Sequence, residues 1–210
     1  MKTDIFPLSI WKTQYDIFKT DYIRDVLFPK LESEFSATKN NNNPTMVNGT
    51  LCTYNQYDQI HKLKEATELC NFAEKEAAKY WKELKYSSLL EPKLIQMWAN
   101  RQPKGGSVRS HLHGTMPITA VLYVNAKNGS GNIVIQNPLE SLLVSQPMDY
   151  DAQAFLHHEI EVKTGDFIMF PGWMHHYVKE NTLEEDRLII GMNFGSKGNY
   201  LAGQWITAQA

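Results

Sequence analysis

The sequence predicts a mainly β protein, an antiparallel barrel or sandwich that is preceded by helices. Apolar residues recur at helical spacing in the first 92 residues, whereas the apolar runs after Pro92 are short and close together. Turn-forming residues separate these runs, and no helical pattern between them suggests the crossovers of a parallel sheet. We therefore expect a helical extension, residues 1–92, that packs on a β core, residues 93–210, within one integrated domain.

Two segments of the extension have a helical period. The first runs from Ile23 to Phe35, and we expect a kink or a restart at Pro29 because proline interrupts main-chain hydrogen bonding. The second is more regular: an apolar stripe extends from Leu63 to Leu84, while Lys and Glu occupy the opposite face. A polar loop, residues 39–44, separates the two helices.

Seven short strands are expected in the β core. Turn sequences such as Pro103 to Gly106 and Thr164-Gly165 separate them. Strands at this spacing, without intervening helices, indicate an antiparallel sheet. The expected strands are Lys93–Asn100, Ile118–Asn125, Asn132–Gln136, Glu159–Lys163, Asp166–Phe170, His175–Lys179 and Arg187–Phe194.

Composition and charge argue against several classes of partner. The net charge is −2 and Lys and Arg are not clustered, so neither nucleic acid nor an anionic membrane is an expected partner. No apolar run approaches the ~20 residues of a membrane span, and the N-terminus lacks the apolar segment of a signal peptide. Cys52 and Cys70 lack the spacing of a zinc site or a disulfide framework. We therefore expect a cytoplasmic protein.

Two histidines near the start of the β core form a His-x-His pair. His111 and His113 follow the Gly105-Gly106 turn and precede an apolar strand. Residues two apart in an extended chain share a face and lie about 6.6 Å from each other. Two imidazoles so placed can bind one metal ion, although exposed histidines often give the same pattern.

A longer motif, GDFIMFPGWMHHYV, runs from Gly165 to Val178 and contains two more histidines. It is typical of a tight turn, a buried strand, a Pro-Gly corner and a second strand that opens with histidine. Histidines at the starts of two strands can meet at one end of a barrel and leave coordination positions free. The motif therefore strengthens the prediction of a metal site.

Arg187 opens the apolar strand RLIIGMNF. A guanidinium in an apolar strand is costly unless an acceptor pairs with it. One interpretation is that Arg187 ends a strand edge beside Glu185 and Asp186. The other is that it faces the metal site, where its planar fork would bind a carboxylate of a dicarboxylate cosubstrate.

In combination these motifs resemble the 2-oxoglutarate/Fe(II)-dependent oxygenase superfamily, whose fold is the double-stranded β-helix, a jelly-roll or cupin-like barrel. The chain is most similar to a group of 2OG-Fe(II) oxygenases found in bacteria and phages. The matching segments are Trp98-Ala-Asn100, His111-Leu-His113, Leu122-Tyr-Val124, Gly165 to Val178, and Arg187 to Phe194.

The resemblance implies Fe(II) as the metal, with His111, His113 and His176 as its ligands. The alignment selects His176 and leaves His175 at the surface or beside a ligand. It also implies that Arg187 binds the distal carboxylate of 2-oxoglutarate. The additional candidates for cosubstrate binding are Tyr123, Asn100 and Asn193.

The implied reaction is oxidative decarboxylation of 2-oxoglutarate to succinate and CO2, coupled to hydroxylation of a C–H bond. The sequence does not identify the primary substrate. β-Helix proteins of this size often pair through N-terminal helices or sheet edges, so a homodimer is compatible with the resemblance.

Two positions depart from the pattern of these oxygenases. Most members have His-x-Asp or His-x-Glu, whereas His113 stands at the carboxylate position and leaves a ferrous site more positive. Gly172 stands where the related motif has serine, and we expect no effect from this change.

Two alternatives remain open. Gly105 to His113 and Gly165 to His176 also resemble the two motifs of cupins, which implies a metal-dependent dioxygenase, isomerase or binding protein that does not use 2-oxoglutarate. The glutamate of that pattern is missing, and Arg187 would have no role. The second alternative is a β-barrel interaction protein without a functional metal, and the joint occurrence of three histidines and Arg187 argues against it.

Overall fold

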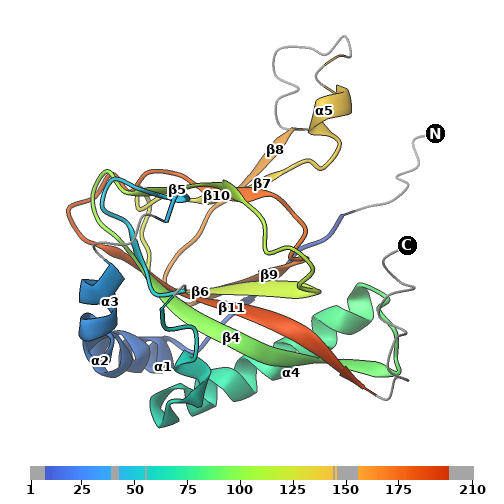
Figure 1. Ribbon diagram of the computed structural model, residues 1–210, viewed down its shortest axis with the longest axis horizontal. Coiled ribbons are helices and arrows are strands. Elements are labelled where there is room, and N and C mark those ends of the chain that lie inside the picture. The colour runs from blue at the N-terminus through green and yellow to red at the C-terminus, as the bar shows by residue number, and fades with distance from the viewer. Residues whose placement is uncertain (1–7, 39–42, 55, 144, 146–155, 199–210) are drawn as a thin grey trace.

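Two antiparallel sheets face each other and form an open jelly-roll sandwich (Figure 1). The computed structural model describes residues 8–38, 43–54, 56–143, 145 and 156–198. The six-stranded sheet has the order β1-β9-β6-β11-β4-β3, and the five-stranded sheet has the order β2-β5-β10-β7-β8. The predicted β fold is therefore confirmed as a jelly roll, although the two sheets do not close into a barrel.

The strands and helices have the following bounds. The strands are β1 (Trp11–Gln14), β2 (Met46–Val47), β3 (Leu51–Cys52), β4 (Leu90–Gln102), β5 (Ser107–His111), β6 (Ile118–Asn125), β7 (Ile133–Gln136), β8 (His157–Ile160), β9 (Asp166–Phe170), β10 (His176–Val178) and β11 (Arg187–Gly198). The helical elements are α1 (Ile17–Tyr22), the π-helical turn η1 (Ile23–Leu27), α2 (Phe28–Lys30), α3 (Glu32–Thr38), the 3-10 turns η2 (Ile60–Lys62) and η3 (Lys64–Ala66), α4 (Thr67–Glu83) and α5 (Glu140–Leu143).

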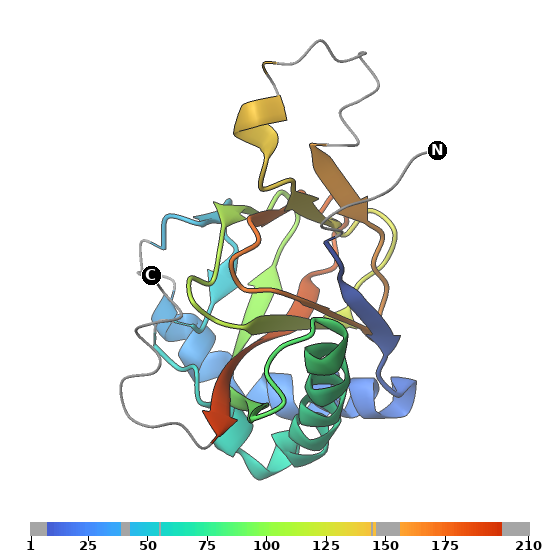
Figure 2. The same ribbon diagram turned by 90° about the vertical axis from the view of Figure 1, so that its right-hand side faces the viewer.

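The helices α1 to α4 cover the outer face of the six-stranded sheet (Figures 1 and 2). The apolar stripe expected between Leu63 and Leu84 forms α4, and its residues Leu69, Ala73 and Ala77 are fully buried. The irregularity expected at Pro29 is the π-helical turn η1, because proline has no N–H for a regular helical hydrogen bond. No helix in the described part of the chain is long and apolar enough to span a membrane.

The first 92 residues are not only helical, and this corrects the sequence-based expectation. β1 forms an edge of the six-stranded sheet by pairing with β9, while β2 and β3 join one sheet each. The sequence of β1, WKTQ, has no alternating apolar pattern, and β2 and β3 have only two residues each. The division at residue 92 stays a prediction, but the first segment contributes three strands to the sandwich.

The two faces of the six-stranded sheet have different surroundings. Met97, Ala99 and Ile190 lie on the outer face and pack with the helices in one hydrophobic core. The residues of β4 and β11 that alternate with these face the second sheet, because successive side chains of a strand point to opposite faces. Main-chain pairing between β4 and β11 places these inward residues side by side. The paired positions are Trp98 with Gly191, Asn100 with Ile189, and Gln102 with Arg187.

Most of the expected strands are present, with changed ends. β6 and β9 have the expected bounds, whereas β4 and β11 are longer than expected and β8 is shifted. β5 was not expected, because its sequence SVRSH contains a single apolar residue. It is a strand because β2 and β10 pair with it on either side.

Candidate metal centre and cosubstrate pocket

The three predicted metal ligands come from neighbouring segments of the five-stranded sheet. His111 ends β5, His113 follows in the next loop, and His176 opens β10. His111 and His176 are direct partners in the antiparallel pair of β5 and β10. A shift of register between His176 and Val178 lies beside them, and such irregularities redirect side chains. As a result, both Val108 and His111, three residues apart, line the cavity between the sheets.

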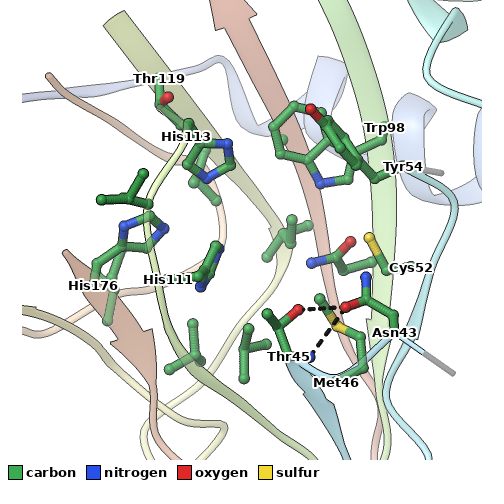
Figure 3. A pocket seen from close by; sticks show the side chains of 18 of the residues that line it. Asn43, Thr45, Met46, Cys52, Tyr54, Trp98, His111, His113, Thr119 and His176 are labelled. Atoms are coloured by element: carbon green, nitrogen blue, oxygen red, sulfur yellow. Dashed lines mark hydrogen bonds between the residues drawn. The ribbon is translucent and has the colours of Figure 1, made fainter. Parts of the chain in front are cut away.

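The three imidazoles form one cluster (Figure 3). The ring centroids of His111 and His176 are 4.3 Å apart, and each lies 5.2 Å from that of His113. One nitrogen from each ring lies within 4.8 Å of the others, so a single ion could contact all three. His175 is exposed, whereas His176 is buried in this cluster.

Main-chain carbonyl groups fix the orientation of two rings. Nδ1 of His111 lies 2.9 Å from the carbonyl oxygen of Arg109, and Nδ1 of His176 lies 3.0 Å from that of Met174. Only a protonated Nδ1 can donate to a carbonyl, so these contacts assign the proton to Nδ1 and leave the lone pair on Nε2. Such a contact is typical of histidines that bind metal through the other nitrogen.

All three rings are held neutral. Burial lowers the pKa of His113 to about 3 and that of His176 well below its ordinary value. Burial also lowers the pKa of His111. Nearby imidazoles lower these pKa values further: His111 acts on His113, and both act on His176. Neutral imidazole is the form that binds metal, so at neutral pH the cluster offers three nitrogen donors without competition from protons.

The loop that carries His113 is bonded to the Pro-Gly corner. The main-chain N–H of His113 donates to the carbonyl of Gly172 at 2.7 Å, and the N–H of Gly172 donates to the carbonyl of Met116 at 3.1 Å. A Cβ atom at position 172 would lie 2.4 Å from that Met116 oxygen. This close approach requires glycine in the present loop, and the expectation that glycine in place of serine has no effect on function stays a prediction.

Arg187 begins β11 in the six-stranded sheet, lines the cavity and is 3% exposed. Its Nη1 donates to Oε1 of Gln102 at 2.7 Å, and its guanidinium carbon lies 5.1 Å from the ring centroid of Tyr123. Its Nε is buried and has no hydrogen-bond partner among the described residues. Burial lowers the pKa of Arg187, an effect that Tyr123 opposes. A buried cation with a free donor, facing a cavity, is suited to bind an anion.

The other cosubstrate candidates differ in position. Tyr123 and Asn100 line the cavity, and Oδ1 of Asn100 is buried without a partner among the described residues. Burial raises the pKa of Tyr123 to about 12, so its hydroxyl stays protonated. Asn193 lies outside the cavity lining: its side chain accepts from Thr119 and donates to Gln96, both at 3.0 Å.

The three histidines and Arg187 line one cavity of about 320 Å³. Histidines line one side of it, and Tyr54, Cys52 and Asn43 lie across from them (Figure 3). Arg187 is the one charged side chain in the described lining. The cavity is large enough for a small dicarboxylate beside a metal ion, with further space toward the opening.

Two residues of this site, Gln102 and Trp98, were not among the predicted site residues. Gln102 orients Arg187 and is itself held by hydrogen bonds from its Nε2 to the carbonyls of Gly106 and Lys179. Trp98 was noted only as part of a motif, but its ring contacts His113. The alternation of β4 provides a usable signal, since Trp98, Asn100 and Gln102 are two residues apart and share a face.

The sandwich core of the chain is similar to a known family. Residues 96–193, from β4 to β11, match the model of a family described as "Putative 2OG-Fe(II) oxygenase". This segment contains the three histidines and Arg187. The resemblance to 2OG-Fe(II) oxygenases that the sequence predicted is therefore confirmed over this segment. No curated protein sequence matches the chain.

Solved structures of such enzymes share the fold at low sequence identity. A Pseudomonas putida prolyl-4-hydroxylase superposes with a TM-score of 0.61 at 14% identity, covering 91% of this chain and 94% of that protein. The epimerase SnoN in complex with Fe3+, alpha ketoglutarate and nogalamycin RO gives 0.59 at 11%, covering 94% and 87%. HygX from Streptomyces hygroscopicus with nickel and 2-oxoglutarate bound gives 0.58 at 10%, covering 90% and 82%.

Proposed function

We propose that this protein is an Fe(II)- and 2-oxoglutarate-dependent oxygenase that hydroxylates a C–H bond. In the balanced reaction, O2 supplies one oxygen atom to the product alcohol and one to succinate, and CO2 leaves from 2-oxoglutarate. The observation that supports this proposal is the pairing of two features across one cavity. Three neutral imidazoles lie on one side, and a buried arginine with an unpaired donor lies on the other.

Each of these side chains has a defined part in the proposal. His111 and His176 bind iron through Nε2, because their Nδ1 atoms are engaged with main-chain carbonyls. Arg187 binds the distal carboxylate of 2-oxoglutarate, while Gln102 holds the guanidinium in place. Bound iron and 2-oxoglutarate would supply the oxidising chemistry, in the cavity between the two sheets.

The third histidine changes the charge of the proposed site. Three imidazole ligands leave the two positive charges of Fe(II) uncompensated, whereas the usual carboxylate ligand would remove one of them. The dianion 2-oxoglutarate then supplies the missing negative charge. We therefore expect iron to bind more tightly in the presence of the cosubstrate than in its absence, because each ligand stabilises the other electrostatically.

The cupin alternative and the non-enzymatic alternative account for fewer features. A cupin-type enzyme without 2-oxoglutarate gives no role to a buried Arg187 that faces the cavity. A protein without a functional metal gives no reason for three neutral imidazoles within 4.8 Å of one another. Iron that binds without any effect of 2-oxoglutarate would favour the cupin, and the absence of iron binding would favour the structural protein.

Succinate formation tests the proposal. Purified protein with Fe(II), ascorbate and 2-oxoglutarate under air should release succinate slowly even without the primary substrate, through uncoupled turnover. His176→Ala should abolish this activity, while His175→Ala serves as the matched control and should retain it, since His175 is exposed. Equal activity of the two variants, or succinate release that does not depend on iron, would refute the proposal.

The remaining parts of the proposal concern setting and partners. Cys52 and Cys70 are free thiols, which supports a reducing, cytoplasmic environment. The partners are the small-molecule cosubstrate and an unidentified primary substrate, and a homodimer is compatible with the resemblance. Light scattering and analytical ultracentrifugation measure the oligomeric state directly.

A further inference from the structure

The three histidines of the proposed metal centre are not held in the same way. The rings of His111 and His176 are fixed by hydrogen bonds to main-chain carbonyls. The ring of His113 makes no hydrogen bond within the described chain, and it lies in a loop beyond the end of β5. Rotation about its side-chain bonds would move its nitrogen away from the position that the other two rings define. A different contact must therefore fix the plane of this ring.

Two rings are stacked on that of His113: the ring of His176, which is itself a proposed ligand, and the indole of Trp98, which is not (Figure 3). The rings of Trp98 and His113 are stacked, with centroids 5.5 Å apart and planes 25° from parallel. Tyr54 contacts the same indole edge-on at 4.9 Å, and Trp98 is only 5% exposed. Trp98 is thus immobilised in the six-stranded sheet and presents a fixed flat surface to a ligand carried by the other sheet.

A glycine on the neighbouring strand makes this arrangement sterically feasible. Gly191 of β11 is the direct main-chain partner of Trp98. A Cβ atom at position 191 would lie 2.4 Å from Cε2 and 2.5 Å from Cζ2 of the indole. The indole therefore lies over β11, in the space that a Cβ atom at position 191 would occupy. An alanine at this position would displace the indole.

We propose that Trp98 is a positioning residue for the third metal ligand: its indole, seated over Gly191, fixes the ring plane of His113. The inference rests on the proposed metal centre and extends it. In this protein an imidazole occupies the position where related enzymes have a carboxylate, and the stacked indole provides the orientation that hydrogen bonds provide for the other two ligands. Partners that orient metal ligands contribute about 10- to 100-fold to metal affinity.

Titration of the metal-free protein with Co(II), without 2-oxoglutarate, tests this proposal independently of turnover. The affinity reports how well the site is organised, and the visible absorption of bound Co(II) reports the ligand geometry. Trp98→Leu and Gly191→Ala should each weaken Co(II) binding about tenfold and alter the spectrum. Trp98→Phe, which retains an aromatic face, should recover most of the affinity.

Gly195→Ala is the matched control on the same strand. The nearest atoms to a Cβ atom there would be those of the Ile95 side chain, with Cδ1 at 3.3 Å, so Co(II) binding should stay within about twofold of wild type. The double variant Trp98→Leu/Gly191→Ala should bind no more weakly than Trp98→Leu alone, because the added methyl group then has no indole to displace.

Three results separate the possible failures. If folded Trp98→Leu binds Co(II) with wild-type affinity and spectrum, Trp98 does not position His113 and the inference is wrong, while the proposed function stands. If wild type itself binds no Co(II) or Fe(II), the proposed function fails. If Trp98→Leu does not fold, the comparison of Gly191→Ala with Gly195→Ala decides in its place, and equal affinities of these two variants would overturn the inference.

Discussion

Replacement of Arg187 by leucine should separate cosubstrate binding from stability. The distal carboxylate of 2-oxoglutarate would lose two charge-assisted hydrogen bonds, each contributing about 1.5–3 kcal/mol. Because such contributions are not fully additive, we expect a loss of about 3–4 kcal/mol, which corresponds to an affinity for 2-oxoglutarate about 10²- to 10³-fold weaker. Stability should change little, since loss of a buried, desolvated cation offsets the loss of the bond to Gln102.

Two measurements on each variant test this expectation. Calorimetric titration of the Fe(II)-loaded protein with 2-oxoglutarate, without oxygen, gives the affinity, and urea denaturation of the metal-free protein gives the unfolding free energy. Arg109→Leu is the control, because this side chain is exposed on β5 and, among the described residues, donates to the Pro44 carbonyl. A 2-oxoglutarate affinity within threefold of wild type in Arg187→Leu would refute the assigned role of Arg187.

Two further predictions concern acid and the Pro-Gly corner. The pKa values of the three cavity histidines are lowered in the folded chain, so below about pH 6.5 the unfolded chain binds protons that the folded chain does not. The unfolding free energy of the metal-free protein is therefore highest above this pH and should fall on acidification, by up to about 1.4 kcal/mol per pH unit for each histidine. Urea denaturation at pH 7.5, 6.0 and 5.0 measures this fall. If His113→Asn leaves the dependence of unfolding free energy on pH unchanged, the prediction is contradicted. Gly172→Ser should lower the unfolding free energy by about 1–3 kcal/mol, because the new Cβ would meet the Met116 carbonyl. Thermal denaturation measures this loss. An unfolding midpoint equal to that of wild type would show that the loop relaxes freely.

The parts of the fold with a strong local pattern could be predicted from sequence. The continuous apolar runs of β6 and β9 and the amphipathic stripe of α4 are local signals, and these elements appear where expected. β1 and β5 could not be found in this way. Each is a strand because it pairs with a distant segment, β1 with β9 and β5 with β10, and its own side chains do not alternate in polarity.

The candidate site, too, could be predicted only in part from the sequence. The sequence indicated which histidines belong together and why Arg187 needs an acceptor. It could not show the register shift that lets Val108 and His111 share a face, nor the strand register that places Gln102 beside Arg187. Asn193 illustrates the opposite case: it lies in the matching motif, but hydrogen bonds to Thr119 and Gln96 engage its side chain.

The central claim is that one cavity binds iron through three histidines and 2-oxoglutarate through iron and Arg187 together. Anaerobic addition of 2-oxoglutarate to the Fe(II)-loaded protein tests it most directly, because chelation of ferrous iron by the keto acid gives a weak, broad visible charge-transfer band. We expect this band in wild type and in His175→Ala, and its loss at the same 2-oxoglutarate concentration in Arg187→Ala. Iron that binds while 2-oxoglutarate produces no band in wild type would contradict the account.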